Sequence, residues 1–310
     1  MLVYMKWGTS IAVAAGVGLI VIGSAYLIYR EPAYIPASAE NPIPEQMMEG
    51  LQENQPLTVQ TTTSHVIVPG RLSNIHDPQV LPGEHAVVVP VLMYHYIRDI
   101  TPEMTTTSRW LSVTPEHFRA QMAEVVKLGY HTITPDDLAD AVSGTRALPT
   151  KPLLITFDDG YRDQYDIAFP ILKELQLKAT FFIITNTLKN PVYQNADMIR
   201  EEDQSGSITI ASHTRNHPLL AHIKPAQQHD EIFGSKKEIE NVVHHPVTSF
   251  AYPYGNFDEA VKTLVSEAGF RIAFSTLLGS VHTPSSIFEA RRIRVLDDES
   301  LGPILKRFVK

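Results

Sequence analysis

Two adjacent carboxylates follow a short apolar segment near the middle of this 310-residue chain. Asp158-Asp159 come directly after Leu-Leu-Ile-Thr-Phe and before Gly160. Successive side chains of an extended strand point to opposite sides, so one carboxylate can ligate a metal ion while the other faces a water molecule. A lone Asp-Asp-Gly is more often a helix N-cap with an Asx turn.

A pair of histidines follows another apolar segment. His213-Thr-Arg-Asn-His217 comes after Ile-Thr-Ile-Ala-Ser. If this segment turns helically, both imidazoles lie on one face, and with one carboxylate they form an open three-ligand metal site. The chain has 13 histidines, so the same spacing also arises by chance. With no cysteine in the chain, any metal must be held by His, Asp or Glu.

Two further polar segments end apolar runs. His95 lies between two tyrosines and is either a core histidine or a general acid. Tyr252-Pro253-Tyr254-Gly255 is either a simple turn or one that directs a backbone N–H at a developing oxyanion. His244-His245 precedes a proline in an expected loop and is interpreted as a surface pair.

The elements around these residues alternate between strand and helix. The predicted helices cover 164–175, 225–242, 257–268 and 299–309, and Thr114-Pro115 and Thr134-Pro135 open two more. The predicted strands are short and almost wholly apolar, which is typical of a buried parallel sheet: 85–95, 153–157, 179–185, 208–211, 248–252, 272–274 and 292–295.

This pattern predicts an α/β fold, a distorted (β/α) barrel of about seven parallel strands. A doubly wound open sheet is the alternative. In a barrel, the carboxyl ends of all strands open on one face, where the polar segments described above would meet.

The N-terminal third has a different composition. The run from Trp7 to Tyr29 carries no charge and is long enough, at about 1.5 Å per helical residue, to cross a bilayer core of about 30 Å. We expect a transmembrane anchor over 1–30, an extracytoplasmic linker over 31–85 and a catalytic domain over 86–310. A cleaved signal peptide is the alternative, since Ala37-Ser38-Ala39 resembles a cleavage site.

Taken in order, Thr156–Gly160, His213-Thr-x-x-His217 and the Pro253-Tyr254 turn resemble the motifs of the polysaccharide deacetylase family, carbohydrate esterases of the NodB-homology type. The resemblance runs over about residues 88 to 297. It implies a distorted barrel, in agreement with the pattern of elements.

The resemblance also implies roles for individual residues. Asp159, His213 and His217 would hold a divalent metal, usually zinc, with other transition metals as alternatives. Asp158 would be the general base that activates the attacking water, and the backbone N–H of Tyr254 would stabilise the oxyanion.

Two departures from the family pattern point to one of its branches. Ala251 stands where many members have an arginine that orients the base, and the late Leu-x-His motif is absent. Both features resemble the exported poly-N-acetylglucosamine deacetylases, which are circularly rearranged and carry the Met93-Tyr94-His95 segment early in the chain. His95 would then be the acid, and Arg292 would replace the missing arginine.

The function expected from this resemblance is metal-dependent hydrolysis of N-acetyl groups, with release of acetate, from a cell-surface or cell-wall polysaccharide: poly-N-acetylglucosamine, peptidoglycan or a chitin-like polymer. The domain would lie outside the cytoplasm on a single-pass membrane protein, or be secreted if the N-terminal segment is cleaved. An O-acetyl esterase and a catalytically weak carbohydrate-binding protein are the alternatives. The net charge of −8 argues against a nucleic-acid partner.

Overall fold

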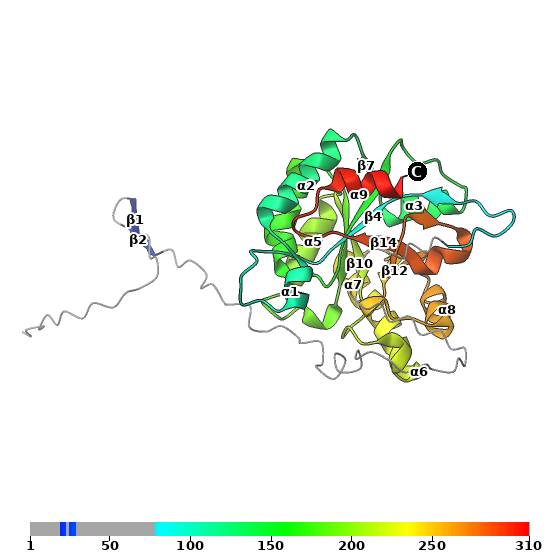
Figure 1. Ribbon diagram of the computed structural model, residues 1–310. Coiled ribbons are helices and arrows are strands. Elements are labelled where there is room, and N and C mark those ends of the chain that lie inside the picture. The colour runs from blue at the N-terminus through cyan, green and yellow to red at the C-terminus, as the bar shows by residue number, and fades with distance from the viewer. Residues whose placement is uncertain (1–18, 23–24, 29–77, 310) are drawn as a thin grey trace, which may run out of the picture. The chain divides into compact units, whose positions relative to one another are not determined.

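The computed structural model describes residues 19–22, 25–28 and 78–309 of the chain (Figure 1). In the N-terminal region, β1 (Leu19–Ile22) and β2 (Ala25–Ile28) pair as antiparallel strands. The described positions within the expected anchor are therefore strands and not helix. Ile, Val and Tyr, which are frequent in these segments, favour strands.

The rest of the expected anchor, and the expected linker up to residue 77, lie outside the described residues. In the parts of the chain that the structure covers, every helix is too short or too polar to cross a bilayer.

Residues 78–309 form an α/β barrel. Its seven parallel strands follow the order β4-β14-β12-β11-β10-β9-β8, and β4 also pairs with β8, which closes the ring. This closure confirms the predicted barrel and excludes the open sheet. The barrel strands are β4 (Val91–Tyr94), β8 (Pro152–Phe157), β9 (Ala179–Ile183), β10 (Ile208–Ser212), β11 (Ser249–Ala251), β12 (Ile272–Leu278) and β14 (Ala290–Arg294).

The barrel is distorted on one side. β10 and β11 are joined at one register position, Ser212 opposite Phe250, and the register between β12 and β14 shifts after Phe274. Short strands complete the domain outside the ring: β7 (His131–Thr132) beside β8, the pair β3 (Val87–Val88) and β13 (Val281–His282), and the pair β5 (Tyr96–Ile97) and β6 (Ser112–Val113).

Helices surround the barrel in Figure 1, with α9 lying beside α2. Thr114 and Thr134 cap α2 and α3 as the sequence predicts, each accepting a hydrogen bond from a backbone N–H three residues later. The helices are α1 (Thr106–Trp110), α2 (Pro115–Lys127), α3 (Pro135–Val142), α4 (Phe169–Glu174), α5 (Ala196–Gln204), α6 (Pro225–His229), α7 (Ser235–Val243), α8 (Glu259–Glu267) and α9 (Leu301–Phe308).

Two predicted helices are less regular than expected. The first begins with a π-helical turn, Gln164–Ala168, ahead of α4, because Pro170 has no N–H to continue an α-helical ladder. The second contains another π turn, Asp230–Gly234, between α6 and α7. The sequence analysis did not predict α5, although the Asn195 side chain caps its first turn by accepting hydrogen bonds from backbone N–H groups.

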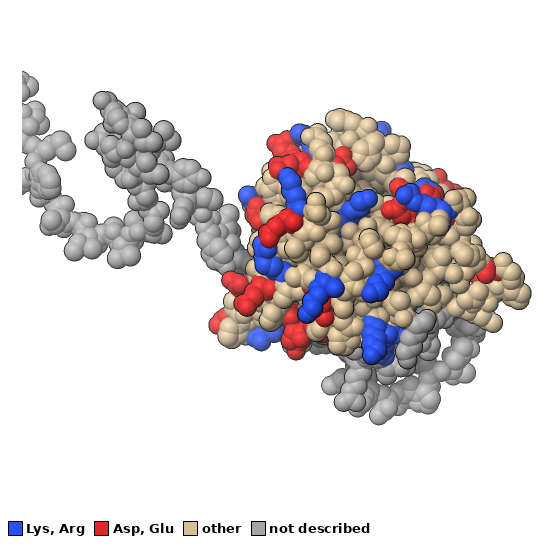
Figure 2. Space-filling view, turned by 90° about the horizontal axis from the view of Figure 1, so that it is seen from above, with Lys and Arg blue, Asp and Glu red and all other residues tan. Residues whose placement is uncertain are grey.

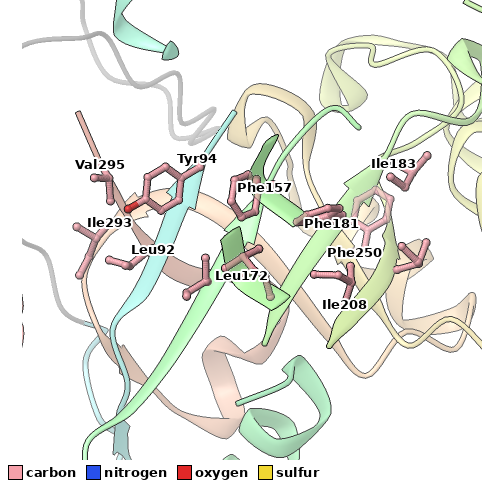
Figure 3. Packing of buried hydrophobic residues seen from close by; sticks show 14 of the residues in the cluster. Leu92, Tyr94, Phe157, Leu172, Phe181, Ile183, Ile208, Phe250, Ile293 and Val295 are labelled. Atoms are coloured by element: carbon pink, nitrogen blue, oxygen red, sulfur yellow. The ribbon is translucent and has the colours of Figure 1, made fainter. Parts of the chain in front are cut away.

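Side chains alternate between the inside of the barrel and the layer beneath the helices. Leu154, Phe182 and Phe274 belong to the inner cluster, whereas their neighbours pack outward. Figure 3 shows part of the outer layer, with Tyr94 and Phe157 among its aromatic rings. The inward positions of each strand continue to its carboxyl end. The polar residues that follow the strands therefore lie on the last layer of side chains at that end of the barrel interior.

Candidate active site

Asp159, His213 and His217 converge at the carboxyl ends of β8 and β10. One potential ligand atom from each residue lies within 4.8 Å of the others. The Asp159 Oδ1 atom is 3.4 Å from His213 Nε2 and 3.3 Å from His217 Nε2, and the two Nε2 atoms are 3.2 Å apart. The structure thus brings the three expected metal ligands together.

The chemistry of this donor set fits a divalent cation. Asp159 Oδ1 is buried and has no hydrogen-bond donor among the described residues. His213 Nδ1 donates to the Ala251 carbonyl at 2.8 Å, which leaves the Nε2 lone pair directed at Asp159. Burial lowers the pKa of His217 to about 4, so this imidazole is neutral at pH 7. Two imidazoles and a carboxylate with one unpaired oxygen are a donor set that suits a divalent metal ion.

Left-handed backbone conformations build this cluster. The φ angle is 76° at Asp159, 67° at Thr214, 58° at His217 and 58° at Tyr254. Such angles are uncommon for residues other than glycine, above all for β-branched threonine, and strained positions of this kind gather at functional sites.

Two local expectations from the sequence are corrected by these conformations. The segment 213–217 is a loop and not a helical turn, and its histidines meet because the chain turns left-handed at Thr214 and His217. The extended backbone expected at Asp158-Asp159 ends at Asp159 in the same way; the Asp159 carboxylate lies beside His213 and His217, whereas that of Asp158 contacts Arg292.

A buried glutamate holds the histidine loop. Glu231, in the π turn after α6, accepts hydrogen bonds from the backbone N–H groups of Arg215 and Asn216 at 2.8 and 2.9 Å. Its other oxygen accepts from the Asn216 side chain at 2.7 Å. Sequence reasoning missed this residue, because Glu231 stands in a polar run with no motif of its own.

Asp158 is clamped by Arg292. The two guanidinium nitrogens Nη1 and Nη2 lie 2.6 and 2.8 Å from the two carboxylate oxygens, and both side chains are buried. Arg292 Nε also donates to the Ser275 carbonyl at 2.8 Å, and this bond holds the guanidinium group in place. Burial acts to raise the pKa of Asp158, but the charge of Arg292 opposes it, and the pKa lies below its usual value.

Ala251 and Arg292 both occupy inward positions of the barrel, on β11 and β14. Ala251 points into the barrel, is fully buried and leaves the interior beside His213 without a long side chain. Arg292 also points inward, two residues after Ala290 of the inner cluster. The guanidinium reaches Asp158 from β14.

His95 follows β4, the strand that pairs with β8, and lies close to Asp158. Its Nε2 atom is 3.8 Å from Asp158 Oδ2. Gln164, which the sequence motifs do not mark, donates to the backbone carbonyls of His95 and Asp158 at 2.9 and 2.6 Å and so ties the two strand ends together. Burial, and then the charge of Arg294, lower the pKa of His95 to about 4.

Tyr254 flanks the cluster from the turn after β11. Its ring centroid is 4.4 Å from that of His217, and the side chain is partly exposed. The adjacent Gly255 has φ 67°, and a Cβ there would collide with the Thr276 side chain, so this turn requires glycine. His244 and His245 are exposed, as predicted.

Comparison with known proteins identifies the family. The sequence profile of polysaccharide deacetylases matches residues 145–273. A Bacillus subtilis protein named as a polysaccharide deacetylase, YxkH, is 32% identical over 212 residues, which are 68% of this chain and 73% of YxkH. The chain belongs to the polysaccharide deacetylase family. It is therefore a hydrolase of the class that acts on N-acetyl amide bonds of polysaccharides.

Two other proteins are similar to this chain at lower sequence identity. The poly-beta-1,6-N-acetyl-D-glucosamine N-deacetylase of Staphylococcus aureus is 27% identical over 173 residues, which cover 52% of this chain and 59% of that protein. The structure of the Streptococcus pyogenes deacetylase PplD, in complex with acetate, superposes with a TM-score of 0.68 at 27% identity and covers 73% of this chain and all of PplD.

Proposed function

We propose that this protein is a metal-dependent N-deacetylase of an extracellular polysaccharide. One observation carries the proposal: the three-ligand cluster, the carboxylate of Asp158 and the imidazole of His95 share one rim of the barrel. Asp159, His213 and His217 would hold the ion, and zinc suits two imidazoles and a carboxylate with open positions. The ion, when bound, would polarise the acetyl carbonyl and increase the acidity of water.

The chain's own residues would move the protons. Asp158 is ionised at neutral pH because its pKa is low, so it can take a proton from the attacking water. Arg292 holds both oxygens of Asp158 and orients the base. His95, neutral in the resting site and 3.8 Å from Asp158, would receive that proton and deliver it to the leaving amine.

The oxyanion would be stabilised from the turn after β11. Tyr254 adopts a left-handed conformation, and its ring packs on His217. We assign its backbone N–H to the oxygen that becomes negative in the transition state.

Two features support poly-N-acetylglucosamine as the polymer: the similarity to the staphylococcal enzyme and the early Met93-Tyr94-His95 segment. On the face of the domain seen in Figure 2, acidic and basic side chains lie interspersed, as suits a neutral glycan.

We propose an extracytoplasmic location, supported by the uncharged run from Trp7 to Tyr29. Protease treatment of intact cells should cleave the protein, whereas full protection in the soluble cytoplasmic fraction would overturn this location.

The test is acetate release by the full-length protein, first stripped of metal and then reloaded with zinc, on N-acetylglucosamine oligomers, peptidoglycan and a model acetyl ester. Release from the N-acetyl glycans should require metal. Asp158→Asn should keep the metal and lose about 10²–10⁴-fold in rate. Release from the ester alone would favour an O-acetyl esterase, and metal binding without any release would favour a carbohydrate-binding protein.

A further inference from the structure

A cavity lies between segments that follow β5 and β14, at the end of the barrel where the carboxyl ends of the strands lie. Its volume is about 540 Å³, within the range of small-molecule sites. One wall comes from the segment after β5, with Ile100, Met104 and Trp110, and the other from the segment that follows β14, with Leu296 and Asp298. Both walls continue from carboxyl ends of barrel strands, which is the rim that carries the chemistry.

Trp110 and Arg294 connect this cavity to the reacting groups. Arg294 follows Arg292 by two residues and so points to the same inward side of β14. Its guanidinium carbon is 5.2 Å from the centroid of the Trp110 ring, which lines the cavity. Its charge also acts to lower the pKa of His95, and the charge of Asp158 acts to raise the pKa of Arg294.

Arg294 has unused hydrogen-bonding capacity. Its Nη1 atom is buried and has no partner among the described residues. Burial lowers its pKa to about 10, so the side chain still carries a positive charge at neutral pH. Buried donors in folded proteins are nearly always paired, so Nη1 is available to an oxygen of a water molecule or a ligand.

We propose that this cavity binds the sugar unit next to the one whose acetyl group is removed. Trp110 provides the flat surface on which the apolar face of a pyranose ring packs. Asp298 accepts hydrogen bonds from sugar hydroxyl groups, and Arg294 Nη1 donates to an oxygen of the glycan between the cavity and the metal cluster. This inference rests on the proposed function, because it takes the substrate to be a chain of N-acetylated sugars.

The chain contains two tryptophans, Trp7 and Trp110, which makes binding directly measurable. In full-length protein with Trp7→Phe, the fluorescence of Trp110 alone is observed. Adding Asp158→Asn prevents turnover during titration. N-acetylglucosamine oligomers of two to six units should change the Trp110 emission, with affinity that rises with length.

Kinetics on the same oligomers give a second measurement. Trp110→Ala should abolish the gain of affinity with chain length, raising KM for the longer oligomers roughly 10-fold or more. Arg294→Met, which keeps the packing on Trp110, should raise KM with a smaller effect on kcat. Tyr130→Ala is the matched control, because Tyr130 precedes β7 at the opposite end of the barrel and should leave KM unchanged.

The outcomes separate this inference from the proposed function. Acetate release without any change of Trp110 emission or any effect of Trp110→Ala would overturn the sugar site and leave the deacetylase. A change of emission without acetate release from any substrate would support the sugar site and contradict the reaction. Neither binding nor release would overturn both.

Discussion

At the scale of single residues, the site depends on how one buried carboxylate is held. Asp158 is buried away from solvent, and the bidentate contact with Arg292 and the nearby imidazoles keep its carboxylate charged. Removing one partner of a buried ion pair lowers the stability of a protein by about 3–5 kcal/mol, because the remaining charge is left buried without a counterion or hydration. Arg292 therefore serves the fold and the orientation of the base at once.

Arg292→Ala should lower the free energy of unfolding by about 3–5 kcal/mol. It should also reduce kcat by about 10–100-fold, the usual effect of losing a residue that orients a reacting group. Thermal unfolding and acetate release measure the two effects. An unchanged kcat would remove Arg292 from any role in orienting Asp158.

Adding Ala251→Arg to Arg292→Ala should restore part of both losses, because position 251 also points inward and stands where other family members carry this arginine. Ala251→Arg alone should destabilise the protein by about 1–3 kcal/mol through overpacking against Arg292. If the double variant is no more active than Arg292→Ala, the two positions are not equivalent.

At the scale of elements, loops with left-handed residues carry the ligands and neighbouring elements hold them. The loop 213–217 depends on Glu231, whose carboxylate binds two of its backbone N–H groups. The turn after β11 depends on Gly255, which packs directly on Thr276 of β12. Both supports lie outside the sequence segments that carry the ligands and the base.

Glu231→Gln should weaken metal binding about 10–100-fold, because a neutral amide offers one acceptor oxygen for three donors. Equilibrium dialysis against zinc measures the affinity. Glu238→Gln is the control: this carboxylate pairs with the Arg215 side chain and should change metal affinity much less. Equal losses in both variants would show that Glu231 has no special part in holding the loop.

Gly255→Ala should cost more stability than Gly269→Ala. Both glycines have positive φ, so each alanine should cost about 1–2 kcal/mol of backbone strain. At Gly269 nothing lies within 4 Å of the added Cβ, whereas at Gly255 it collides with Thr276. Only Gly255→Ala should also reduce acetate release, and equal Tm and activity in the two variants would contradict this account of the turn.

At the scale of the whole domain, one buried acid makes stability depend on pH. Glu202 in α5 is fully buried, and neither of its oxygens has a hydrogen-bond partner among the described residues. Burial raises its pKa to about 9, above the ordinary 4.5. Between these values the unfolded chain loses the proton and the folded domain keeps it, so stability falls as the pH rises.

Glu202→Gln should therefore raise Tm at pH 8, by about 2–4 °C for each kcal/mol gained, and have little effect near pH 4.5. Thermal unfolding at the two pH values measures the difference. Glu267→Gln, at an exposed position in α8, should leave Tm unchanged at both. A Glu202→Gln effect that is equal at the two pH values would show that ionisation is not its cause.

The sequence by itself determined the positions of the barrel strands and the starts of several helices. Apolar runs marked the parallel strands, because a strand covered on both faces must be apolar throughout. Thr114 and Thr134 marked helix starts through their capping side chains. Asp159, His213 and His217 stood out because their residue types can ligate metal and each follows a strand.

Only the tertiary structure decided which distant residues complete the site. β4, the first barrel strand in the chain, closes the ring between β8 and β14 and so brings His95 and Arg292 close to Asp158. Glu231, Gln164 and Arg294 carry no motif, and their parts depend on strand pairing across the barrel. Such contacts follow from closure of the whole ring, and the spacing of residues along one segment does not contain that information.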